Sequence, residues 1–96
     1  MFIITLTYLK PAEEIDKLLA AHREYLREQY ANGIFLMSGR QVPRTGGIIL
    51  ATADSRADIE AVIELDPFNE AGAASYTITE FVPTMTADSL SAFKQA

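Results

Sequence analysis

Hydrophobic residues recur at helical spacing over residues 11–32, and this stretch dominates the pattern of the chain. Residues three or four positions apart lie on the same face of a helix. The apolar members of this face are Ile15, Leu18, Leu19, Tyr25, Leu26 and Tyr30. His22, the only histidine, falls in the middle of that face. The pattern therefore predicts a long helix whose buried side carries one titratable ring.

A second helical stripe follows in the second half of the chain. It consists of Ile59, Val62 and Ile63. Ser55, with Asp58 three residues later, resembles a capping box and marks the start of this helix. Asp66 falls at the next helical step, and Pro67 stops the helix because it cannot donate a backbone hydrogen bond. We expect the second helix to end at Asp66 with its carboxylate on the core face.

Four stretches alternate with the period of two that is typical of β-strands. They cover residues 2–9, 34–42, 48–52 and 74–82. Residues 43–47 have turn composition, so the second and third strands are expected to form an antiparallel hairpin. Residues 67–72 are expected to be a loop. Residues 86–94 are expected to form a short closing helix around Leu90 and Phe93.

The resulting order, β-α-β-β-α-β, is that of a ferredoxin-like α+β fold with both helices on one face of an antiparallel sheet. The 96 residues contain no linker and are expected to form a single domain, 1–96. Two helices leave the other sheet face uncovered, and its apolar area would exceed the ~300–600 Å² that a monomer usually exposes. We therefore predict a homodimer packed sheet to sheet, a dimeric α+β barrel with two-fold symmetry.

Composition narrows the classes of partner. A net charge of −5 and a pI near 4.7 oppose binding to nucleic acid or anionic membranes. The apolar runs are too short to span a bilayer, and the first residues have the pattern of a strand, not of a signal peptide. The absence of cysteine excludes disulfide and thiol chemistry. Together these features predict a cytoplasmic protein without nucleic-acid or membrane partners.

His22 and Asp66 are the main candidates for chemistry. A nearby carboxylate orients a buried imidazole, favours its charged form and offsets part of its desolvation. The fold should place a His22 nitrogen within hydrogen-bond or one-water distance of an Asp66 oxygen, and a separation beyond ~7 Å would exclude the pair. Such a pair supplies general acid/base catalysis, typically worth ~10²–10⁴-fold. The pattern leaves a second interpretation open, a core histidine beside an aspartate that ends a helix or caps a turn.

Other polar residues provide binding groups or alternative chemistries. The binding groups are Ser38, Arg40, Arg44, Tyr25 and Tyr76, and an arginine could hold an anionic substrate. Ser38 would be a nucleophile only if His22 lay within ~3.2 Å of it. One histidine without cysteine or a His-Glu-x-x-His spacing predicts no metal site, and we expect no organic cofactor.

Three further groups have simpler interpretations. Gly46 and Gly47 lack the lysine and the spacing of a phosphate-binding loop and are interpreted as the hairpin turn. Arg23 and Arg27 lie beside acidic neighbours and are expected on the solvated face of the first helix. The tyrosines of that helix, at positions 25 and 30, are expected in the core or at an interface.

Several of these residues also form a pattern that resembles a known family. The segment 66–78 begins Asp-Pro-Phe and continues with Ala71-Gly72, Ser38-Gly39 lies on the second strand, and His22 lies on the first helix. Over nearly the whole chain this pattern resembles the YCII-related (YciI-like) family. The resemblance implies a dimeric α+β barrel with a histidine/aspartate acid/base site, and elimination from a chlorinated hydroxyquinol is an activity of a relative.

Carried over residue by residue, the resemblance makes His22 and Asp66 the catalytic pair. It makes Ser38, Arg40 and Phe68 candidates for substrate binding. Arg40 departs from the family, in which proline often follows the glycine, so the relative's substrate is not carried over. The sequence predicts a small enzyme that performs acid/base chemistry, including a lyase-type elimination, on a small aromatic or anionic molecule. The alternative is a non-catalytic ligand-binding or dimerisation module.

Overall fold

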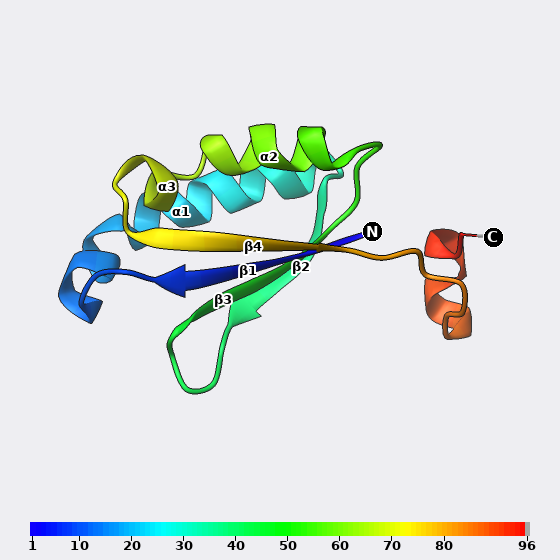
Figure 1. The fold of residues 1–96 in the computed structure, drawn as a ribbon, viewed down its shortest axis with the longest axis horizontal. Coiled ribbons are helices and arrows are strands. Elements are labelled where there is room, and N and C mark those ends of the chain that lie inside the picture. The colour runs from blue at the N-terminus through cyan, green and yellow to red at the C-terminus, as the bar shows by residue number, and fades with distance from the viewer. Residues whose placement is uncertain (96) are drawn as a thin grey trace.

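The structure is a computed structural model that describes residues 1–95, and these form a four-stranded antiparallel sheet with helices on one face (Figure 1). The strands are β1 (Phe2–Tyr8), β2 (Phe35–Arg40), β3 (Gly46–Ala51) and β4 (Ala74–Glu80). The helices are α1 (Ala12–Ala31), α2 (Arg56–Glu64), the one-turn α3 (Pro67–Glu70) and the 3₁₀ helix η1 (Asp88–Phe93). The sheet order is β2-β3-β1-β4, which confirms the predicted α+β fold of ferredoxin-like type.

Helix α1 begins and ends close to the predicted residues. Glu13 and Glu14 lie in its first turn, where they interact favourably with the helix dipole, and Gly33 follows its end with a φ of 75°. Pro11 is the N-cap residue of the helix. The predicted apolar face packs onto the sheet, although Tyr30 at its end remains 37% exposed.

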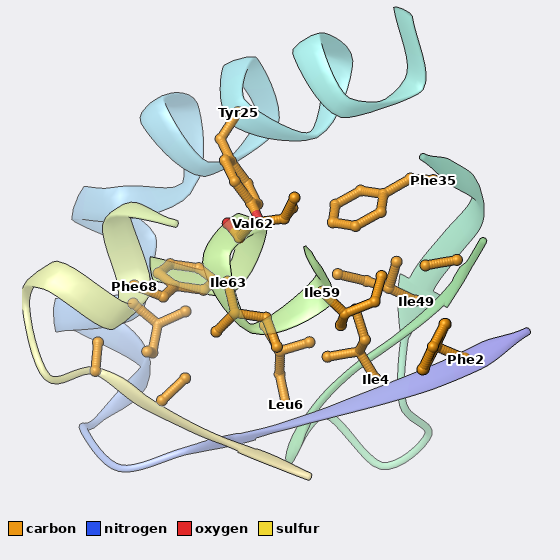
Figure 2. Close-up of a cluster of buried hydrophobic side chains, with 14 residues drawn as sticks. Phe2, Ile4, Leu6, Tyr25, Phe35, Ile49, Ile59, Val62, Ile63 and Phe68 are labelled. Atoms are coloured by element: carbon orange, nitrogen blue, oxygen red, sulfur yellow. Dashed lines mark hydrogen bonds between the residues drawn. The ribbon is translucent and has the colours of Figure 1, made fainter. Parts of the chain in front are cut away.

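The core lies between this face of α1, the apolar stripe of α2 and one side of the sheet (Figure 2). Ser55 caps α2 as predicted, since its hydroxyl accepts a hydrogen bond from Asp58 N at 3.2 Å. Tyr25 reaches from α1 toward α2, and its hydroxyl donates a 2.8 Å hydrogen bond to the Val62 carbonyl. The two helices are therefore joined directly as well as through the sheet.

No helix within residues 1–95 covers the opposite sheet face (Figure 1). Strand pairing places Ile3 beside Leu50, and Thr5 beside Ile48, on this face. Ile48 is 36% exposed, and Met37 at the β2 edge is 55% exposed. The open face therefore has an apolar centre, as the element order predicted.

The predicted turn at residues 43–47 lies two residues too far along the chain, because β2 ends at Arg40 and β3 begins at Gly46. Gly46 and Gly47 belong to β3 and pair with Thr7 and Leu6 of β1. A Cβ atom at Gly46 would lie 1.7 Å from the Leu6 carbonyl oxygen. Glycine is required there because two strand backbones approach closely, and not because the chain turns.

The connection after α2 also differs from the prediction. The second helix ends at Glu64, and Asp66 is the N-cap of α3, a helical turn in the segment predicted to be a loop. Pro67 starts this turn because a proline without N–H fits the first position of a helix. The C-terminal helix η1 has no buried residue and lies beyond the end of the sheet, so it does not close the core (Figure 1).

Candidate active site

His22 and Asp66 meet at the junction of α1 with the α2–α3 connection. His22 Nδ1 lies 2.8 Å from Asp66 Oδ1, which confirms the predicted contact. A carboxylate only accepts, so Nδ1 carries the hydrogen in the neutral ring and Nε2 carries the lone pair. Nδ1 is also the only ring nitrogen with a hydrogen bond to residues 1–95. The arrangement therefore presents Nε2 as the basic atom.

Asp66 is fully buried, with a relative exposure of 0%. Its Oδ1 also accepts from Phe68 N at 3.0 Å, and its Oδ2 accepts from the Tyr76 hydroxyl at 2.6 Å. A buried carboxylate is tolerated when such donors compensate for its lost hydration. Asp66 therefore caps α3 and orients His22 at the same time, so the two interpretations of this residue are not exclusive.

The His22 ring is held by packing as well as by hydrogen bonding. It stacks on Phe68 with ring centroids 4.1 Å apart and an interplanar angle of 14°. The side chain retains 12% exposure. One ring face and one nitrogen are therefore fixed by the protein, and His22 also lines a cleft.

This cleft has a volume of about 150 Å³. Its apolar lining includes Leu6, Leu19, Leu26, Ile49 and Phe68. Its polar lining consists of Tyr8, His22, Arg23, Ser38 and Arg40. Ser38 and Arg40 reach it because they pair with Ile49 and Gly47 and so lie on the helix-facing side of the sheet. Four of the five predicted site residues thus line one cleft, and Asp66 lies behind His22.

Two predictions about individual residues have clear outcomes. Ser38 is hydrogen-bonded to Tyr30 and to no His22 atom within residues 1–95, so the condition for a serine nucleophile is not met. Arg23 was predicted on a solvated face; its side chain is exposed but also lines the cleft, because β2 brings the opposite wall close to α1. No cluster of three or more potential metal ligands occurs in the part of the chain that the structure describes.

Comparisons with known proteins identify the family and the fold of the chain. Residues 1–82 match the YCII-related domain. The chain belongs to the YCII-related domain family. A solved structure of 5-chloro-2-hydroxyhydroquinone dehydrochlorinase from Burkholderia phenoliruptrix, in complex with 2,5-dihydroxybenzoquinone, is similar with a TM-score of 0.69. The alignment has 20% identity and covers 84% of this chain and 93% of that chain, which shows a shared fold. No curated protein sequence matches the chain.

Two tyrosines complete the site of this YCII-related domain. Burial raises the pKa of Tyr76 above its ordinary value of 10.0, and its hydrogen bond to Asp66 raises it further. Burial also raises the pKa of Tyr25, with a smaller contribution from the Asp66 charge. Tyr76 is therefore protonated at neutral pH and acts as a fixed donor to the carboxylate.

No helix within residues 1–95 is long and apolar enough to cross a membrane.

We expect Tyr76→Phe to change how stability depends on alkaline pH. The folded protein holds the Tyr76 proton above the ordinary pKa of 10.0, whereas the unfolded chain releases it there. Stability from this group is complete below pH 10.0 and is lost as pH rises above it. The stability difference between wild type and Tyr76→Phe, measured by urea unfolding, should therefore be constant below pH 10.0 and narrow as pH rises above it. If the free energy of unfolding depended on pH in the same way in both proteins, Tyr76 would not be the group responsible.

Proposed function

We propose that this YCII-related domain is a small acid/base enzyme in which His22 and Asp66 transfer a proton on a small aromatic molecule. The observation that carries the proposal is the 2.8 Å hydrogen bond from Nδ1 to a buried carboxylate, made by a histidine that lines a largely apolar cleft. A basic nitrogen, an orienting acid and a partly dry binding space are the components that general base catalysis requires.

The proton transfer follows from the tautomer. Nε2 takes a proton from a ring hydroxyl of the substrate, and the electron pair left on oxygen moves into the ring. In an elimination, the ring carbon that bears the leaving group takes this proton from Nε2, and removal of a second hydroxyl proton by Nε2 then expels the leaving anion, so the substrate loses one proton and one anion overall and needs no oxidant. Asp66 stabilises the imidazolium that forms, and the proton then passes from Nε2 to water. The Asp66 contact strengthens as His22 becomes charged, which favours the transfer.

The similar dehydrochlorinase supports the elimination class. Its name describes loss of hydrogen chloride from a chlorinated hydroquinone, and its structure contains a six-membered quinone ring. A cleft of about 150 Å³ matches the size of one such ring, because an engineered cavity of that volume holds benzene. Phe68, stacked with His22, provides an aromatic surface beside the proposed ring position.

The test is a titration with 2,5-dihydroxybenzoquinone followed by ¹⁵N NMR of the single histidine. Before ligand is added, the neutral ring should have its hydrogen on Nδ1. The ligand should then perturb Nε2 more than Nδ1, and chloride release from 5-chloro-2-hydroxyhydroquinone should exceed the rate without protein. A ligand that binds elsewhere and leaves both His22 nitrogens unchanged would contradict the proposal.

A ligand-binding or dimerisation module is the second candidate, and the capping role of Asp66 favours it. The carboxylate has a structural function through Phe68 N and Tyr76 whether or not a substrate binds. In this case the same ring ligand would bind and perturb Nε2, but no product would form. Measured chloride release from 5-chloro-2-hydroxyhydroquinone therefore distinguishes the enzyme from the binding module.

The open sheet face supports a homodimer as part of the proposal. Its apolar centre on β1 and β3 lacks a cover, and the exposed segment after β4 carries Val82 and Met85, which are 55% and 88% exposed. A second copy packed sheet to sheet would bury these apolar side chains with two-fold symmetry.

We expect light scattering at micromolar concentration to give twice the chain mass of 10.6 kDa. Ile48→Glu should return the mass to that of one chain, because it places a charge at the centre of the proposed interface. Lys17→Glu, on the exposed side of α1, is the matched control and should remain dimeric. A wild-type mass of one chain would exclude the dimer.

A further inference from the structure

A wider hollow of about 490 Å³ lies beside the His22 cleft. The hollow is lined by Tyr8, Asp16, Leu19, Arg23, Arg40 and Arg44. Four of these residues, Tyr8, Leu19, Arg23 and Arg40, also line the cleft itself. The two spaces therefore adjoin along Arg23 of α1 and Arg40 of β2.

The charge of this opening differs from that of the whole protein. Three of the five arginines in the chain line it, against one acidic residue, Asp16, whereas the chain as a whole carries −5. A local excess of two positive charges at the mouth of an apolar cleft attracts anions and repels cations.

The three arginines are not equivalent. Arg44 donates to Asp16 Oδ1 at 2.6 Å and lies over the Tyr8 ring at 5.9 Å, so its charge is largely matched. In contrast, neither Arg23 nor Arg40 takes part in an ion pair among residues 1–95. These two guanidinium groups are therefore available to a ligand.

Resting on the proposed function, we propose that Arg23 and Arg40 form an anion-binding entrance and that the substrate is a ring carboxylate. The ring would occupy the apolar cleft beside His22 and Phe68, and its carboxylate would remain in the wider hollow between the two guanidinium groups. Arginine suits this role because its planar donors match the two oxygens of a carboxylate. The apolar lining explains why the ring and the carboxylate occupy different parts of the opening.

The test compares 2,5-dihydroxybenzoate with 2,5-dihydroxybenzamide, which has nearly the same shape without the charge. Calorimetry with the whole protein at low salt should show binding of the acid at least tenfold tighter than that of the amide, and added salt should reduce this preference. Arg23→Gln and Arg40→Gln should each remove most of the preference. Arg27→Gln is the matched control, since Arg27 lies on α1 in an exposed pair with Glu24 and should leave the preference unchanged.

Equal affinity for acid and amide, no binding of either, or an equal loss in Arg27→Gln would overturn the proposed entrance. The NMR signals of the His22 nitrogens distinguish failure of the anion-binding proposal from failure of the acid/base proposal. If 2,5-dihydroxybenzoquinone perturbs Nε2 but the protein binds the acid no more tightly than the amide, the acid/base proposal stands and the carboxylate specificity is wrong. If the acid binds through both arginines without affecting His22, the anion site stands and the acid/base proposal is wrong.

Discussion

Replacing Asp66 with alanine is expected to lower the free energy of unfolding by about 3–5 kcal/mol, the usual cost of removing one member of a buried polar pair. The substitution removes the acceptor of three donors at once: His22 Nδ1, Phe68 N and the Tyr76 hydroxyl. Each unsatisfied buried donor costs about 1–3 kcal/mol, and a domain of this size has only about 5–15 kcal/mol in total. The midpoint of thermal unfolding should fall by roughly 15 °C or more.

Asp66→Asn should have an intermediate effect. Its carbonyl oxygen can still accept from Phe68 N and cap α3, but its amide nitrogen would face the Tyr76 hydroxyl. Asp58→Ala, which changes an exposed carboxylate on α2, is the control for the loss of a negative charge. All variants should be compared at one protein concentration because a dimer makes stability depend on concentration. A loss below about 1 kcal/mol in Asp66→Ala would show that water replaces the carboxylate.

The order of strands and long helices could be predicted because each has a strong period of its own. The first and last residues of each helix and strand could not be predicted in the same way, because they depend on contacts between distant parts of the chain. Gly46 has the composition of a turn, yet the close approach of the Leu6 carbonyl places it in β3. The one turn of α3 is too short to show a helical period, so Pro67 could mark the end of one helix or the start of another.

The His22–Asp66 contact could be predicted, although for a partly incorrect reason. Asp66 was placed on the core face of α2, whereas it lies beyond the helix and turns inward by capping α3. Its distance from α1 depends on that cap. Gln29 shows the opposite case: it lies at the helical spacing of the buried face and is 3% exposed, but its polar side chain kept it out of the predicted core.

Arg23 shows why the mouth of the cleft could not be predicted. Acidic neighbours along α1 indicate a solvated position, and the side chain is indeed exposed. Its place at the cleft depends on Arg40 and on the edge strand β2, which are distant in sequence and join α1 only through the fold. Spacing along one helix contains no information about that opposite wall.

The largest functional effect is expected from His22→Ala. Loss of the only group placed to accept the substrate proton should reduce turnover by ~10²–10⁴-fold, while the fold should remain about as stable as wild type. Stability is preserved because the Asp66 carboxylate keeps two donors, Phe68 N and the Tyr76 hydroxyl. Enzyme rates and urea unfolding, measured on the same samples, test both parts.

His22→Phe separates packing from chemistry, since it keeps an aromatic ring against Phe68 and removes both nitrogens. If His22 serves proton transfer, the alanine and phenylalanine variants should be equally inactive and should differ little in stability. If His22 only fills the core, alanine should cost about 2–5 kcal/mol, as buried large-to-small changes do. Phenylalanine should then recover most of that loss. Strong destabilisation by alanine, combined with normal turnover in the phenylalanine variant, would assign His22 to packing and would exclude the acid/base mechanism.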